Sequence, residues 1–176
     1  MKKIIAYLAM SLNGKIARSD GQVDWLDAIP NPEKSDYGYY AFYDTIDTTI
    51  MGHSTYRLLM SWDVEFPYKD KKNYVLCKEE KLENPYVDPI QLEDIAALKN
   101  QEGKDIWLIG GGVTNTALLN AGLIDEMIIH IMPIIIPDGI DLFGSIPKET
   151  SFDLKDSCSY SSGVMELHYK VTTHNT

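Results

Sequence analysis

Three consecutive glycines at residues 110–112 constrain this chain more than any other feature. They join the apolar stretch 106–109 to a segment with a helical pattern that begins near Thr114. Glycines let a backbone approach a ligand where a Cβ would collide, and the start of a helix offers N–H groups and partial positive charge to an anion. The join predicts a nucleotide phosphate site, with a tight turn that binds nothing as the alternative.

The spacing differs from the Rossmann dinucleotide fingerprint. Asn115 stands where that fingerprint has its third glycine, and no acidic residue follows about 20 residues later to bind a ribose. The motif also lies late in the chain, whereas a Rossmann fingerprint occupies the first strand-to-helix turn. We therefore expect a different nucleotide-binding fold.

Composition limits the remaining classes. The 176 residues are 44% hydrophobic and contain no repeat or linker, which predicts one domain spanning 1–176. No apolar run is long enough for a membrane span and no signal peptide pattern is present, so we expect a cytoplasmic protein. The formal net charge of −10 argues against nucleic acid as a partner. Cys77 and Cys158 have no metal-ligand spacing and are expected to be free thiols.

Apolar stretches alternate with helical patterns along the chain, which predicts an α/β fold with a mixed, mainly parallel sheet and helices on both faces. The expected strands are 3–10, 48–51, 74–77, 106–109 and 127–136. The expected helices are 33–45, 54–61, 93–101 and 114–120. At the C-terminal end, 151–158 and 164–172 are expected to form an antiparallel hairpin.

A second strand-to-helix join lies at residues 49–56. The strand ends at Gly52, and Ser54 or Thr55 could cap the helix that follows. Two helix starts suit a ligand with phosphates at separate places, although a glycine turn with an ordinary cap is the simpler reading of this segment alone.

Residues 6–17, 36–40, 51–56 and 109–112, taken in order, resemble the dihydrofolate reductase-like superfamily. Within it, the Ser-Leu-Asn-Gly-Lys-Ile-Ala segment at 11–17 and residues 122–143 are similar to the reductase branch of riboflavin biosynthesis. That branch reduces the ribosyl group of 5-amino-6-(5-phosphoribosylamino)uracil with NADPH. The zinc deaminase motifs of the bifunctional enzymes are not present, so the resemblance implies a stand-alone reductase.

The resemblance also implies an NADPH site across the sheet, with the pyrophosphate between the two helix starts. The implied cofactor-binding residues are Ala9 and Ile16 beside the nicotinamide, Gly52, His53, Ser54 and Thr55 on the adenosine side, Leu76 and Lys78 near the adenine and its 2′-phosphate, and Gly110, Gly111, Gly112, Val113 and Asn115 at the glycine turn. Relatives carry a cis Gly-Gly bond at this turn, which predicts a cis bond between Gly110 and Gly111.

Position 53 departs from the family pattern. Relatives usually carry Arg, which can bind the 2′-phosphate with two hydrogen bonds, whereas His is only partly charged near neutral pH. The expected preference for NADPH over NADH is weaker for this reason, and Lys78 would compensate unless it is an ordinary surface lysine.

For the substrate, the resemblance implies Asp36 as the pocket carboxylate and candidate proton donor, with Tyr7 and Tyr40 packing against the substrate ring. A helix-start acid is the alternative for Asp36, and ordinary core packing is the alternative for both tyrosines. Trp25 either covers the ring or anchors its loop. The expected activity is reduction of a small heterocyclic, carbonyl or imine compound; a dihydrofolate reductase or a non-catalytic nucleotide-binding protein are the alternatives. Relatives form homodimers, and the apolar stretch 127–136 is either an interface or a covered central strand.

Overall fold

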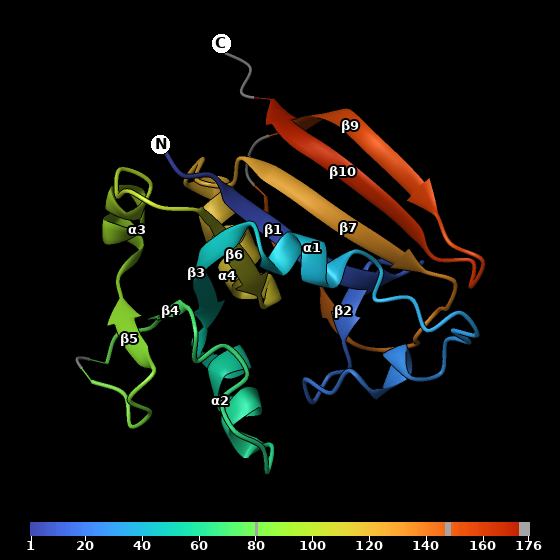
Figure 1. The fold of residues 1–176 in the computed structure, drawn as a ribbon, viewed down its shortest axis with the longest axis horizontal. Helices are drawn as coiled ribbons and strands as arrows, with labels where there is room; N and C mark the ends of the chain where they lie inside the picture. The colour runs from blue at the N-terminus through green and yellow to red at the C-terminus, as the bar shows by residue number, and fades with distance from the viewer. Residues whose placement is uncertain (80, 147–148, 173–176) are drawn as a thin grey trace.

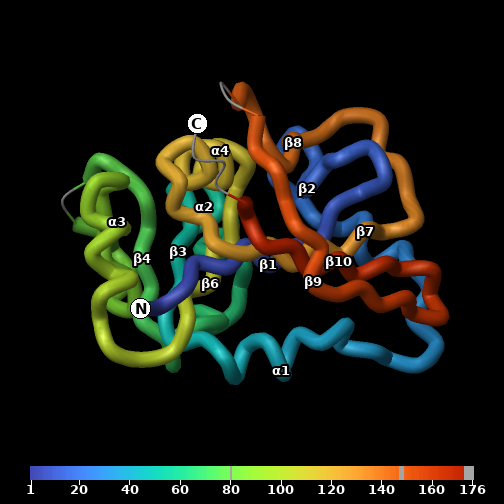
Figure 2. Tube along the Cα trace, turned by 90° about the horizontal axis from the view of Figure 1, so that it is seen from above, coloured from blue at the N-terminus to red at the C-terminus, as the bar shows by residue number. Residues whose placement is uncertain are grey.

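The computed structural model describes residues 1–79, 81–146 and 149–172. Its framework is an eight-stranded sheet in the order β5-β4-β3-β6-β1-β7-β10-β9 (Figure 1), with a two-stranded sheet of β2 and β8 beside it (Figure 2). The strands are β1 (Ile4–Ser11), β2 (Lys15–Ala17), β3 (Ile46–Gly52), β4 (Lys72–Leu76), β5 (Val87–Ile90), β6 (Asp105–Gly110), β7 (Glu126–Met132), β8 (Ile140–Asp141), β9 (Ser151–Ser159) and β10 (Met165–Thr172).

The helices cover both faces of this sheet. They are η1 (Asp24–Leu26), α1 (Tyr39–Tyr43), α2 (His53–Ser61), α3 (Leu92–Leu98) and α4 (Gly112–Asn120). Figure 2 shows α1 on one side of the sheet and α4 on the other. Phe42 of α1 packs with Trp107 of β6 on one face, while Ile95 of α3 and Leu118 of α4 belong to the core on the opposite face. The large apolar area that both faces bury stabilises the sheet.

The strand pairing confirms the predicted mixed, mainly parallel sheet. β1 pairs in parallel with both β6 and β7, and β3 pairs in parallel with β4 and β6. β10 runs antiparallel to β7, and β9 antiparallel to β10. The C-terminal hairpin therefore closes one edge of the sheet, as the sequence predicts.

The predicted helix 33–45 is wrong over its first half, because only Tyr39–Tyr43 is helical. Lys34 and Tyr37 both have φ of 51°, and Gly38 has φ of 78°. A right-handed helix cannot continue through such left-handed residues. The segment before α1 is consequently a series of turns.

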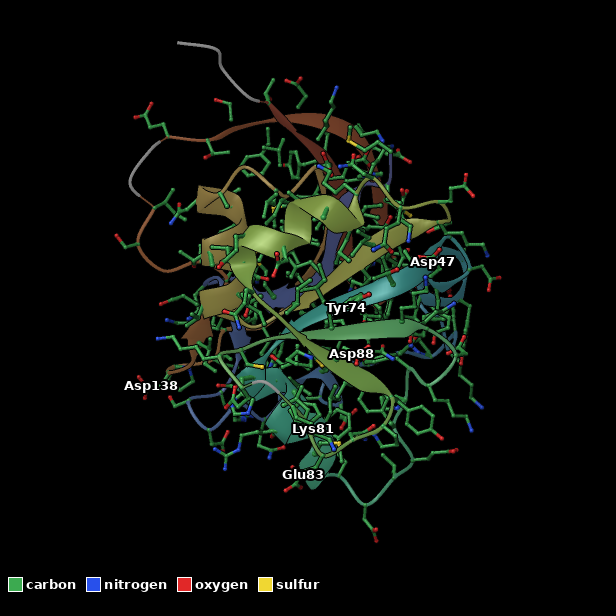
Figure 3. All side chains as sticks on the ribbon, turned by 90° about the vertical axis from the view of Figure 1, so that its left-hand side faces the viewer. Asp47, Tyr74, Lys81, Glu83, Asp88 and Asp138 are labelled. Carbon is green, nitrogen blue, oxygen red and sulfur yellow. The ribbon has the colours of Figure 1, made fainter. Side chains whose placement is uncertain are left out.

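Two other differences follow from proline. The predicted strand 127–136 ends at Met132, because Pro133 cannot donate to the ladder; Ile136 is buried in a separate cluster with Trp25. The apolar pattern of the sequence does not predict β5, a short strand containing Pro89. β5 lies at the edge of the sheet, where proline is tolerated. Asp88 of β5 lies opposite Tyr74 of β4 (Figure 3).

No helix formed by the described residues is both long enough and apolar enough to cross a membrane.

A buried carboxylate ties the C-terminal hairpin to the sheet. The Glu126 side chain is 7% exposed, and its oxygens lie 2.8 Å from Lys3 Nζ, 3.0 Å from Lys155 Nζ and 2.7 Å from His168 Nε2. Burial alone would raise the pKa of Glu126, but the hydrogen bonds from Lys3, Lys155 and His168 prevail and lower it to about 2. These contacts connect β7 to the chain entering β1 and to both strands of the hairpin.

We expect Glu126→Gln to lower the free energy of unfolding by about 3 kcal/mol at neutral pH, because it removes the buried carboxylate that Lys3, Lys155 and His168 stabilise. The Glu126 pKa is lower in the folded state than its ordinary value of 4.5. The carboxylate therefore stabilises the fold fully above that value, and this contribution is lost as the pH falls from 4.5 towards 2. Urea unfolding between pH 2 and 7 measures this, with the exposed Glu102→Gln as control. Equal stability of the two variants would contradict the assignment.

Candidate functional site

A cavity of about 780 Å³ lies at the carboxyl ends of β1, β3, β4 and β6. Ligands of open α/β sheets bind at this edge, because loops and helix starts converge there. Most of the residues implied by the resemblance line it. They are Tyr7, Ala9, Ile16, Gly52, His53, Ser54, Thr55, Leu76, Lys78, Gly111, Gly112 and Val113.

The starts of α2 and α4 meet across this cavity. The Thr55 hydroxyl of α2 donates a hydrogen bond of 3.2 Å to the Gly110 carbonyl. A Cβ on Gly52 would collide with the Thr114 hydroxyl of α4. Gly52 is thus required by the close packing of the two helix starts.

Both helices begin without a side-chain cap among the described residues, since their N-cap residues are Gly52 and Gly111. The expectation that Ser54 or Thr55 caps α2 is wrong, because the Thr55 hydroxyl is directed to Gly110 instead. The first N–H groups of an uncapped helix are free to bind an anion. Two such sets of donors therefore adjoin the same cavity.

The glycine turn differs from its predicted form. The peptide bond between Gly110 and Gly111 is trans, so the prediction of a cis bond is wrong. Positive φ angles make the turn instead, 109° at Gly110 and 57° at Gly111. At Gly111 the backbone has ψ of 155°, a combination restricted almost entirely to glycine.

Gly110 and Asn115 lie behind the cavity wall rather than in it. The Asn115 side chain is fully buried and donates to the Leu142 carbonyl at 3.3 Å. Its Oδ1 atom faces Gly110 and has no hydrogen-bond partner among the described residues. A buried acceptor without a donor is energetically costly, so Asn115 Oδ1 is a destabilising feature of this turn.

The charged residues of the cavity wall gather at the β4 end. His53, Lys78 and Glu93 line this part, which is formed by the starts of α2 and α3 and the end of β4. Glu79 Oε1 lies 3.6 Å from His53 Nε2, and both side chains are partly exposed. A protonated His53 can therefore form an ion pair with Glu79 of the same chain.

The structure places Asp36 and Tyr40 outside the cavity wall. The exposed Asp36 carboxylate accepts hydrogen bonds from the backbone N–H groups of Gly38 at 3.1 Å and Tyr40 at 3.0 Å. The Tyr40 and Gly38 hydrogen bonds hold the pKa of Asp36 below its ordinary value. Tyr40 is 69% exposed. This geometry matches the alternative of a helix-start acid, and the substrate roles of both residues stay predictions.

Tyr7 lines the cavity and is fixed by two neighbours. Its ring stacks on Phe42 at 4.2 Å between centroids, and its hydroxyl donates to the Tyr37 carbonyl at 3.0 Å. His130 Nε2 lies 2.9 Å from the same carbonyl and 3.0 Å from Glu166. His130 therefore belongs to a buried polar cluster beside the cavity that no sequence motif indicates.

The loop that includes Trp25 covers one side of the cavity. Trp25 itself is buried against Met132 and Ile136, so it anchors the loop, while Val23 and Leu26 line the cavity. Sequence reasoning also missed Tyr68 and the residues at the start of α3, Gln91, Leu92 and Glu93. A predicted strand β5 would have placed the start of α3 at the cavity, because the chain leaves each parallel strand at the edge of the sheet where the cavity lies. No motif indicates Tyr68.

Comparison with known proteins identifies the family of this chain. The sequence matches the family described as the RibD C-terminal domain over residues 68–165. The uncharacterized protein YwjB of Bacillus subtilis is 36% identical over 172 residues, which cover 96% of this chain and 97% of that protein.

Two solved structures define the fold family. A protein from Shewanella sp. PV-4, provisionally assigned to riboflavin biosynthesis, is 33% identical with a TM-score of 0.87, covering 97% of this chain and 99% of that one. Dihydrofolate reductase from Enterococcus faecalis in complex with NADP(H) is 16% identical with a TM-score of 0.67, covering 97% of each chain, which shows a shared fold. The protein described here belongs to the RibD C-terminal domain family.

Proposed function

We propose that the protein is an NADPH-dependent reductase of the riboflavin biosynthesis type, acting on a small heterocyclic, carbonyl or imine compound. The observation that carries the proposal is the convergence of two uncapped helix starts on one cavity. Such starts bind phosphate groups through backbone N–H donors and the helix dipole. A dinucleotide cofactor has two adjacent phosphates and fits this arrangement.

The residues of the cavity suit NADPH. The pyrophosphate would lie between residues 52–55 and 110–115, where Gly111 leaves space for it. Ala9 and Ile16 would flank the nicotinamide, and Leu76 with Lys78 would border the adenine. When bound, the cofactor supplies a hydride, while the chain orients it and excludes water from the reacting atoms.

The charges at the β4 end bear on cofactor preference. In the proposed arrangement His53 and Lys78 lie near the 2′-phosphate of NADPH. Glu79 lies close enough to His53 to compete with the 2′-phosphate for an ion pair with it. The Glu79 carboxylate would also repel the phosphate. We therefore propose that preference for NADPH over NADH is modest in this protein.

The reductase branch of riboflavin biosynthesis is favoured over dihydrofolate reductase, because the Shewanella protein is closer in both sequence and structure than the Enterococcus enzyme. Asp36 and Tyr40 remain predicted substrate residues, together with Tyr7. A protein that binds a nucleotide without catalysis is the second candidate; reduction of any substrate by bound NADPH separates the two.

We also propose a cytoplasmic homodimer that acts on small molecules. β7 is unsuited as the interface, because it lies between β1 and β10 and its Met127 and Met132 are buried. β9 lies at the edge of the sheet and leaves Leu154 55% exposed. Light scattering is expected to give twice the mass of the chain, and a monomer at all concentrations would contradict a dimer.

Titration of the purified protein, followed by fluorescence, is expected to show NADPH binding at micromolar concentration. Replacing His53 by Arg should increase the preference for NADPH over NADH by about tenfold, because Arg forms two charge-assisted hydrogen bonds with a phosphate. Arg57→Gln is the control, since Arg57 is exposed on the same helix outside the cavity wall. Failure to bind either dinucleotide would reject the reductase proposal.

A second test uses paired glycine substitutions. Gly111→Ala should weaken NADPH binding by at least about tenfold, because it adds a Cβ and strain at the proposed phosphate contact. Gly122→Ala is the matched control: its φ is 66° and no atom lies within 4 Å of an added Cβ, but it lies outside the cavity wall. Both variants should lose thermal stability, and only Gly111→Ala should lose affinity. Equal NADPH affinity in the two would show that the triple glycine is only a turn.

A further inference from the structure

The two ends of the cavity differ in chemistry. At the β4 end lie the charged residues His53, Lys78 and Glu93. The rest of the wall, which we call the β1 end, carries no charged side chain among the described lining residues and includes Tyr7 of β1, Ile109 of β6 and Tyr68, whose ring contacts Trp107 of β6. A phosphate placed there would lose its hydration without gaining a cation, which is strongly unfavourable.

Tyr68 is held firmly at this uncharged end. Its ring meets Trp107 edge-on at 5.2 Å between centroids and Phe66 in the same manner at 5.9 Å. Aromatic contacts of this kind fix the ring, since both neighbours are themselves buried. The position of the Tyr68 side chain is therefore determined before any ligand binds.

The Tyr68 hydroxyl is an available donor. It makes no hydrogen bond to the described residues, yet it is not among the unpaired polar atoms sealed from solvent. Burial, and to a smaller extent Tyr39, raise the pKa of Tyr68, so the hydroxyl keeps its proton at neutral pH. The hydroxyl of Tyr7, by contrast, is already donated to the Tyr37 carbonyl.

We propose that the β1 end of the cavity binds a planar, uncharged substrate that lacks a phosphate group, and that the Tyr68 hydroxyl donates a hydrogen bond to its reacting oxygen or nitrogen. This inference rests on the proposed NADPH-dependent reductase function, and it departs from the phosphorylated substrate of the riboflavin branch. The aromatic faces of Tyr7 and Tyr68 suit a planar ring.

The chemical role of Tyr68 follows from the electron balance of reduction. In the proposed reaction, bound NADPH would supply a hydride, and this hydride would form a C–H bond at the carbon of a C=O or C=N group. The π electron pair moves to the oxygen or nitrogen, which takes a proton from water and leaves as an alcohol or amine. A hydrogen bond from Tyr68 stabilises the negative charge that develops on this atom before the proton arrives.

Asp36 is the competing candidate for the group that assists reduction at the substrate's oxygen or nitrogen. Its carboxylate is exposed and accepts two backbone hydrogen bonds that lower its pKa, so it is ionised and cannot donate a proton at neutral pH. Reduction should therefore depend on Tyr68 rather than on Asp36.

The test compares pairs of related compounds of which one member carries a phosphate group and the other does not. One pair is 5-amino-6-(5-phosphoribosylamino)uracil and its phosphatase product; the other is 4-formylphenyl phosphate and 4-methoxybenzaldehyde. NADPH oxidation gives kcat and KM, and fluorescence titration of the NADPH complex gives the affinity for each compound. The member without phosphate is expected to bind more tightly and react faster in at least one pair. Preference for the phosphorylated members, or no binding of the uncharged ones, would overturn the proposal.

Variants test the hydroxyl itself. Tyr68→Phe should lower kcat/KM for the preferred compound by about tenfold and leave the NADPH affinity within about twofold. Tyr86→Phe is the control, because Tyr86 is exposed and also packs on Phe66 but lies outside the cavity wall. A loss of activity in Asp36→Asn with none in Tyr68→Phe would overturn the proposal. A protein that fails to bind NADPH at all would refute the proposed function instead.

Discussion

The close contact between the starts of α2 and α4 organises the rest of the structure. Thr55 reaches across to the Gly110 carbonyl, and Gly52 admits Thr114 where any side chain would collide. Because both starts are joined in this way, their free N–H groups are held on one cavity instead of on two separate surfaces. The parallel strands β3 and β6 pair directly beneath them, so the sheet fixes the spacing.

This arrangement divides the cavity into two chemical regions. Helix-start donors and charged side chains gather where β3, β4 and β6 end, whereas the rest of the wall is uncharged and includes Tyr7 and Tyr68. The tyrosine region is stiff, since Tyr7 is stacked on Phe42 and its hydroxyl is bound by the Tyr37 carbonyl. Tyr37 has a positive φ of 51°, and donors from Tyr7 and His130 on its carbonyl help to hold that strained conformation. A rigid pocket of this kind loses little entropy when a planar ligand binds.

The sequence predicted the parts of this structure that depend on local pattern. The strand-to-helix joins at Gly52 and Gly111, the parallel central strands and the C-terminal hairpin follow from periodicity and glycine positions, and the structure contains them. The family resemblance adds the cavity residues, most of which do line it.

Features that depend on tertiary context could not be predicted in the same way. The helical pattern at 33–45 fails because Tyr37 is held in a left-handed conformation by contacts from distant strands. β5 is too short to show an alternating pattern and contains a proline, which argues against a strand. Proline is tolerated there because β5 lies at the edge of the sheet, and this position is known only from the structure. Tyr68 reaches the cavity from a loop without a motif, through packing against Trp107. The trans geometry of the glycine turn likewise differs from what relatives suggest.

Hydrogen exchange of the backbone amides, followed by mass spectrometry with and without NADPH, tests the central claim most directly. If the two helix starts jointly bind the cofactor phosphates, amides in residues 52–58 and 111–117 should both be protected when NADPH is present. Protection of only one start, or protection confined to residues outside the cavity wall, would contradict the account.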